Sequence, residues 1–353
     1  MSDQFPFHEL AGAIHLHTSF SDGGISFPEL IVTAQEVGLD YIVVTDHMNL
    51  GGKKAGYEGF FGGLFVAVGY EHQDFRNRNH YLSIGVEKVA EDRKDPQTYI
   101  RQIARQGGAG FIAHPMEQRH YFKKLPPYPW TAWDARDFDG IELWNQMSDW
   151  MENFKNWRSV VRIFFPRRFM NDAPAGLIKR WDEMNRARFV AAIGGVDAHT
   201  RRVDLGLIHF TIFPVKVELK GIRTHLYLPA PLPRNDPVRA SRILVHALRS
   251  GHGFISNLRR GDARGTRLYL RDANGAIIGP GIPPSPPALP ATLVAELPAR
   301  ARIRLVRNGA PVNTVDGRSA EFPISQNGIY RIEAVADHAW IYANPFPVGA
   351  YPI

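Results

Sequence analysis

The residues whose types could do chemistry begin with His15 and His17, two histidines with one residue between them. Alternate side chains of a β-strand lie on the same face, so a strand over residues 13–17 would present both imidazoles together. Asp22 follows in a Ser-Asp-Gly-Gly turn, whose glycines allow the backbone to fold back toward the strand. This spacing indicates two nitrogen ligands and one oxygen ligand for a metal ion.

Further histidines and carboxylates stand where other predicted strands begin or end. The β-branched run over residues 41–45 leads into His47, and the apolar run over residues 64–70 leads into Glu71. The complete set of candidate metal ligands is His15, His17, Asp22, His47, Glu71, His80, His114, Asp197 and His199. The other histidines, which include His8, His209, His225 and His338, show no such placement, and we expect them to be structural or solvated.

This many ligands exceeds one four-coordinate site and suits two to three divalent metal ions that share a bridging carboxylate. Two ions about 3.5–4 Å apart can bridge a hydroxide, lower its pKa and bind the oxygens of a phosphorus or carbonyl centre. The chain has no cysteine, and a site of His, Asp and Glu favours hydrolytic zinc, manganese or iron. The predicted chemistry is hydrolysis of a small anionic or ester substrate.

The elements that must position these ligands alternate between strands and helices. Ser26 and Glu29 form a capping box that starts a helix ending at Gly38, and Asp95 caps a helix over residues 96–106. Polar residues recur at the C-terminal ends of the predicted strands, which favours an α/β fold, a β/α barrel with its active site at that face. We expect this hydrolase domain to span residues 8–258, with a last helix over residues 239–250.

Residues 118–188 are rich in Trp, Tyr, Phe, Arg and Pro and read as an insertion in the barrel. An amphipathic helix is predicted over residues 151–165, and it would cover the barrel or form a dimer surface. The alternative is a substrate lid that brings Arg119 and His120 to an anionic group. Glu142 also has two interpretations: it could orient a ligand histidine, or it could pair with a basic residue of the insertion.

The sequence changes character after Arg259. A hairpin signal over residues 267–278 is followed by a Pro-rich loop and by short alternating strands up to residue 343. We therefore predict a small β-sandwich over residues 259–353 that has no ligand cluster.

The motifs quoted above, together with Thr45-Asp46-His47, His114-Pro115 and Asp197-Ala198-His199, resemble the polymerase-and-histidinol-phosphatase (PHP) domain of metal-dependent phosphoesterases. This resemblance implies a distorted (β/α)7 barrel with a trinuclear site. It would place the first metal on His15, His17, Glu71 and Asp197, the second on Glu71, His80 and His114, and the third on Asp22, His47 and His199. Glu71, Asp197 and His199 would then also serve catalysis, and no separate general acid is assigned.

The C-terminal segment resembles the immunoglobulin-like sandwich of PHP hydrolases similar to carbaryl-hydrolysing carbamate esterases. The leading prediction is a phosphoesterase, and the alternative is a carboxylic or carbamic ester hydrolase that uses the same metals. A third reading is a metal-stabilised binding protein, which the number of ligands disfavours.

The length, charge and composition of the chain are compatible with these predictions. A chain of 353 residues suggests about two domains. The net charge of +7 fits a solvated basic surface, and we do not expect nucleic-acid binding. With neither a basic-apolar leader nor an apolar run of membrane-spanning length, we expect a cytoplasmic protein. The oligomeric state is left open.

Overall fold

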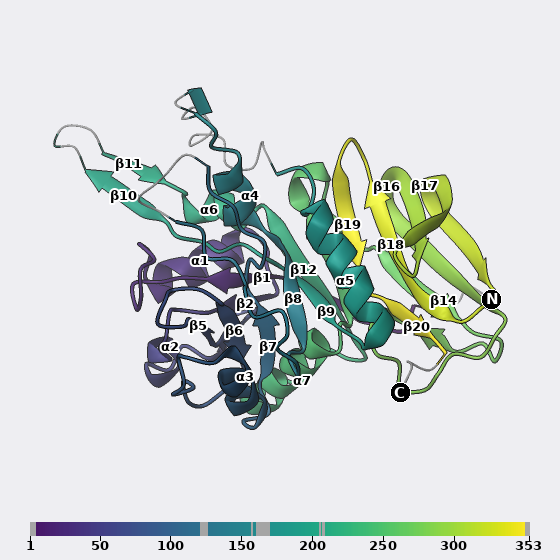
Figure 1. Cartoon of the computed structure of the whole chain (residues 1–353), viewed down its shortest axis with the longest axis horizontal. Coiled ribbons are helices and arrows are strands. Elements are labelled where there is room, and N and C mark those ends of the chain that lie inside the picture. Colours follow the sequence, from purple (N-terminus) through teal and green to yellow (C-terminus); the bar gives the residue numbers. More distant parts are fainter. Residues whose placement is uncertain are drawn as a thin grey trace.

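The computed structural model describes residues 5–120, 126–156, 158–159, 170–204, 206 and 209–349. Strands and helices alternate in the N-terminal part, and the chain after residue 258 is rich in β-structure (Figure 1). The predicted α/β class is therefore confirmed. Among the described residues no helix is both long enough and apolar enough to cross a membrane.

The first N-terminal strands are built around β1 (His8–Leu16). This strand runs parallel to β2 (Tyr41–Val44) and antiparallel to β12 (Ile222–Leu228). β2 is parallel to β4 (Leu64–Val68), and β3 (Gly59–Phe61) lies at the edge. β2 and β4 are buried along their whole length, which explains their continuous apolar sequences.

A second sheet contains β5 (Tyr70–His72), β6 (Tyr81–Ile84), β7 (Ala109–Ile112), β8 (Gly140–Asn145) and β9 (Ala191–Gly195) in that order. Isolated bridges between Leu16 and Ala198 and between His47 and Glu71 join it to the first sheet. β6 runs antiparallel to both of its neighbours, whereas β7, β8 and β9 are parallel. The distorted (β/α)7 barrel stays a prediction, and the strands that carry the candidate ligands are not all parallel.

Helices cover these sheets and begin close to the predicted caps. The Ser26 capping box starts α1 (Phe27–Glu36), and Asp95 caps α3 (Pro96–Ala104). The last helix of this part, α7 (Pro237–Arg249), is capped by Asp236. The other helices are α2 (Gly51–Lys54), α4 (Gln146–Glu152), α5 (Ala175–Ala187) and α6 (Val215–Glu218), and β10 (Arg201–Asp204) pairs with β11 (His209–Ile212).

The predicted helix over residues 151–165 is wrong where the structure describes it. α4 begins earlier, directly after β8, because the side chain of Asn145 accepts a hydrogen bond from Ser148 N at 2.7 Å. It ends at Glu152, and Phe154 then packs against Trp150 with ring centroids 4.3 Å apart. Residues 157 and 160–165 lie outside the described residues, as does part of the predicted lid, residues 121–125.

The C-terminal strands differ from the predicted series of short strands. Residues predicted as two strands form one strand, β16 (Ala291–Arg307), whose register shifts between Glu296 and Ala301. It pairs with an equally unexpected long strand, β17 (Ala310–Ile324). The remaining elements are β13 (Gly253–Asn257), η3 (Leu258–Arg260), β14 (Arg267–Arg271), β15 (Ile277–Ile278), β18 (Gly328–Val335), β19 (Ala339–Ala343) and β20 (Phe346–Val348).

One sheet crosses the expected domain boundary. β19 pairs with β13, with Ile255 opposite Tyr342, so the C-terminal strands continue the sheet that contains β12 and β1. Helix α5 lies between β8 and the C-terminal strands (Figure 1). The described region after residue 258 is thus a β-rich extension of the N-terminal sheet, and the separate immunoglobulin-like sandwich stays a prediction.

Candidate metal centre

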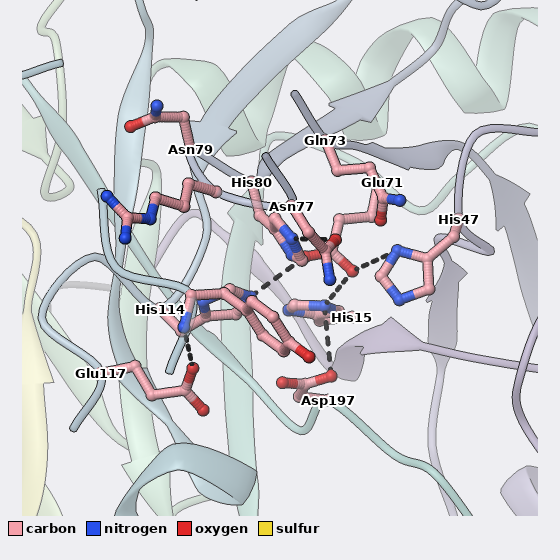
Figure 2. Close-up of polar contacts among 12 residues, drawn as sticks. His15, His47, Glu71, Gln73, Asn77, Asn79, His80, His114, Glu117 and Asp197 are labelled. Atoms are coloured by element: carbon pink, nitrogen blue, oxygen red, sulfur yellow. Dashed lines mark hydrogen bonds and ion pairs between the residues drawn. The ribbon is translucent and has the colours of Figure 1, made fainter. Parts of the chain in front are cut away.

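The nine candidate ligands gather at or near the ends of strands. Figure 2 shows six of them, His15, His47, Glu71, His80, His114 and Asp197. β1 presents His15 and is followed by His17, β2 is followed by His47, and β5 contains Glu71. His80 precedes β6 because that strand runs in the opposite direction. The other members are Asp22 in the loop after β1, His114 after β7, and Asp197 and His199 after β9.

Glu71 is the hub of this cluster. Its Oε2 lies 3.1 Å from His15 Nε2, 3.3 Å from His17 Nε2 and 3.3 Å from His47 Nδ1. Its Oε1 lies 2.7 Å from His80 Nδ1 and 3.0 Å from His114 Nε2. Five imidazoles therefore surround one carboxylate that is only 1% exposed.

Two further carboxylates complete the cluster. Oδ1 of Asp197 lies 3.4 Å from His15 Nε2, 3.4 Å from His17 Nε2 and 3.2 Å from His199 Nδ1. Oδ1 of Asp22 lies 3.2 Å from His199 Nε2. The Asp22 side chain is 52% exposed whereas that of Asp197 is 9% exposed, so the cluster opens toward solvent on the Asp22 side.

Burial and neighbouring charges shift the pKa values of these groups in opposite directions. Burial alone would raise the pKa of Glu71, but the imidazoles of His15, His47 and His80 lower it well below its usual value. Burial lowers the pKa of His47 to about 4. Burial also acts against protonated His114, but the hydrogen bond to Glu71 raises the pKa of His114 to about 9. Carboxylates are thus held anionic among imidazoles of mixed protonation, from which a cation would displace protons.

Glu142 on β8 supports this cluster from behind. Its Oε1 lies 2.8 Å from His15 Nδ1, and its Oε2 accepts from the backbone N–H of His114 at 2.7 Å. Gly195 makes this approach possible, because a Cβ there would lie 1.7 Å from Oε1 of Glu142. Asn145 joins Glu142 to Asp197 through its amide, at 2.9 and 3.3 Å. Of the two interpretations of Glu142, the contact with His15 is the one the structure shows.

Three candidate ligands adopt the left-handed backbone conformation that non-glycine residues rarely take. The φ angles are 66° at His15, 27° at His114 and 56° at Asp197. At His15 the register of β1 against β2 shifts between Ile14 and Leu16, which turns the imidazole toward Glu71. Strain of this kind concentrates at functional sites, where the surrounding fold holds it.

Arg119 was expected near an anionic group of the substrate, and the structure places its guanidinium against a carboxylate of the protein. Arg119 pairs with the buried Glu117, with Nη2 2.7 Å from Oε1. His120 is exposed, and a substrate role for either residue stays a prediction. Glu117, Asn145 and Tyr128 were not expected near the centre; the position of Asn145 at the end of β8 was the one sequence signal available.

The side chains present fit divalent metal ions. Both ring nitrogens of His17, together with Nδ1 of His47 and Nδ1 of His114, are buried without a hydrogen-bond partner. Unsatisfied buried nitrogens are costly in a protein, and a bound cation would satisfy them. Ligand atoms lie within 4.8 Å of one another in four sets: His17, Asp22, His47 and His199; His15, His17 and Glu71; His15, His114 and Asp197; His47, Glu71 and His80.

These sets overlap with the implied trinuclear arrangement without reproducing it. The set implied for the third metal gains His17, and His114 groups with His15 and Asp197. His80 and His114 nevertheless share Oε1 of Glu71, as the second implied set requires.

Residues 13–111 match the model of the PHP domain family. The resemblance that the motifs indicate is thereby confirmed, and the matched segment contains the candidate ligands from His15 to His80. His114, Asp197 and His199 lie beyond it. No curated protein matches this chain.

Among solved structures, the chain is similar to a two-domain protein from Bacteroides vulgatus that contains a predicted PHP-like metal-dependent phosphoesterase. The two sequences are 16% identical, and the structures superpose with a TM-score of 0.48 over 98% of this chain and 97% of that one. It is also similar to PsfC from Pseudomonas syringae, at 14% identity and a TM-score of 0.39, covering 68% and 96%. A candidate metal-dependent phosphoesterase from Bifidobacterium adolescentis matches at 13% identity and a TM-score of 0.33, covering 53% and 87%.

Proposed function

We propose that this protein is a metal-dependent hydrolase of ester bonds and, more specifically, a phosphoesterase with two to three divalent ions around Glu71. The observation that carries the proposal is the convergence of five imidazoles on one buried carboxylate. The buried nitrogens of His17, His47 and His114 that make no hydrogen bond support it, because a bound cation would satisfy them.

The ions would be held by the residues named for the three implied sets, with His17 shared between the first and the third. Divalent zinc, manganese or iron bound here would supply an activated water and neutralise charge on the phosphoryl oxygens. Glu142 accepts from His15 Nδ1–H, which leaves Nε2 of His15 free to face Glu71 and Asp197. The side-chain amide of Asn145 donates to Oδ2 of Asp197 and so orients that carboxylate.

The substrate would enter on the solvent-facing side of the cluster. The side chains of Asp22, His47 and His199 are 52%, 21% and 20% exposed, whereas His15 and His17 are fully buried. Asp197, 9% exposed, lies 3.2 Å from His199 of the exposed layer, and this pair would exchange a proton with the leaving group.

The direct test compares variants of the metal-loaded protein on a phosphomonoester, a phosphodiester and an aryl carbamate. His15→Ala and Asp197→Ala should each reduce turnover by a factor on the order of 10³, because each removes a group from the centre of the cluster. His338→Ala is the matched control, since His338 pairs with Asp172 away from the cluster.

Retained turnover in His15→Ala or Asp197→Ala would refute the assignment of the centre. Turnover of the carbamate alone would instead establish the alternative ester hydrolase at the same site.

A further inference from the structure

We propose that Tyr128 is a positioning residue for His80 and that the buried Glu117 fixes Tyr128 in that place. This inference rests on the proposed function, since His80 is one of the candidate metal ligands. It concerns one residue of the insertion, Tyr128, and the residue directly before the insertion, Glu117, neither of which a sequence motif marks.

The edges of the His80 ring are held by polar contacts. Nδ1 faces Glu71 Oε1 at 2.7 Å, and Nε2 faces Asn77 Oδ1 at 3.2 Å (Figure 2). These two contacts hold the ring at its edges and leave its faces to be packed by other side chains.

Tyr128 packs against one of these faces. Its ring stacks on His80 with centroids 5.2 Å apart and an interplanar angle of 10°. By contrast, His47 and His114 meet His80 edge to face, at 5.7 and 5.0 Å. Tyr128 is thus the described aromatic residue that lies parallel to the imidazole, and it covers one face of it.

Glu117 anchors Tyr128 from the backbone side. Oε2 of Glu117 accepts from the backbone N–H of Tyr128 at 2.8 Å, and Glu117 is only 4% exposed. Its Oε1 accepts from Arg119 Nε and Nη2 at 2.9 and 2.7 Å. Both carboxylate oxygens are therefore committed, which makes Glu117 a rigid attachment for two residues separated by eight positions.

Arg119 closes the arrangement on its outer side. Its guanidinium carbon lies 5.0 Å from the centroid of the Tyr128 ring, within the range of a cation–π contact. The result is a stack of Arg119, Tyr128 and His80, in which Glu117 holds Arg119 and Tyr128. Arg119 thus contacts Tyr128 while its charge is paired with Glu117.

The test measures metal binding by the purified full-length apoprotein, titrated with Zn²⁺ against a chromophoric chelator. Tyr128→Ala should weaken one equivalent of Zn²⁺ about 10- to 100-fold and leave the others unchanged, as expected when a group that orients a ligand is lost. Tyr128→Phe keeps the stack and should bind within about threefold of the parent protein. Glu117→Gln should give the same selective loss with a smaller magnitude, because it weakens the anchor of Tyr128.

Tyr57→Ala is the matched control, because Tyr57 also stacks on an aromatic ring, that of Phe27, at 4.6 Å and 9°. It should leave every equivalent unchanged. Equal Zn²⁺ affinities in Tyr128→Ala and the parent protein would overturn the inference alone. A uniform loss of all equivalents, with an equal fall in the unfolding temperature of the apoprotein, would show a merely structural role and overturn it too. If the parent protein bound none of Zn²⁺, Mn²⁺ and Fe²⁺, that result would instead overturn the proposed function.

Discussion

At the scale of single residues, Glu71 contacts more of the candidate ligands than any other described residue, because it lies within 3.3 Å of nitrogens from five histidines. Glu71→Gln keeps the size of the side chain but removes the negative charge that faces these imidazoles. We expect it to lose at least one equivalent of metal and to reduce turnover by a factor on the order of 10³. Elemental analysis of the purified variant, beside steady-state kinetics, checks both results. Full metal content with normal turnover would show that Glu71 is not the bridge.

Residue types and positions at strand ends were enough to predict eight members of the cluster, because each stands next to a run of residues that forms a strand. Asp22 was predicted from the glycine turn that follows the first strand. Their partners could not be found in this way. Glu142 was left with two interpretations, since a carboxylate within a strand gives no sign of what faces it. Tyr128 and Glu117 act through contacts with residues distant in the sequence, and such contacts follow only from the packed fold.

At the scale of elements, the predicted caps located two helices. α1 and α3 begin where Ser26 and Asp95 accept hydrogen bonds from the first turn. No cap was predicted for α7, whose start was placed two residues late, because Asp236 precedes the apolar pattern that indicated this helix. α4 was missed because β8 leads into it with no glycine or proline between them, and Asn145 serves both elements. β17 was missed because most of its side chains are exposed, which removes the apolar alternation expected of a strand.

A residue of helix α4, Asp149, leads us to expect that the stability of the protein depends on pH. Burial raises the pKa of Asp149 to about 7, and this residue accepts a hydrogen bond from Trp144 Nε1 at 3.3 Å. The folded protein then binds more protons than the unfolded chain between about pH 4 and 7. The stability that protonated Asp149 contributes is complete below the unfolded pKa and is lost as the pH rises through 7.

Asp149→Asn removes this titration. The unfolding free energy of the variant minus that of the parent apoprotein should rise by about 3 kcal/mol from pH 5 to pH 8. Chemical denaturation at several pH values measures this change. A difference between the two proteins that does not vary with pH would contradict the assigned burial of Asp149.

At the scale of the whole molecule, the C-terminal strands support the strand that carries Asp197. Asn344, just after β19, accepts from the backbone N–H of Ala192 in β9 at 2.7 Å and donates to its carbonyl at 3.0 Å. Arg331 on β18, only 4% exposed, makes a two-pronged contact with Asp182 of α5, at 2.8 Å for each pair of atoms. The C-terminal part is therefore attached to the same framework as the candidate centre.

Sequence reasoning separated these two parts at residue 259 because the composition changes there. It could not show that β19 pairs with β13, since pairing between distant strands depends on the register and not on local composition. The practical consequence is that the intact chain is the appropriate material for tests of the metal centre.

The most direct test of the account is the metal content of the intact protein, measured by elemental analysis after purification without chelator and again after reconstitution with zinc, manganese or iron. The convergence of nine ligands predicts two to three equivalents per chain. Less than half an equivalent, unchanged by reconstitution, would contradict the proposed centre.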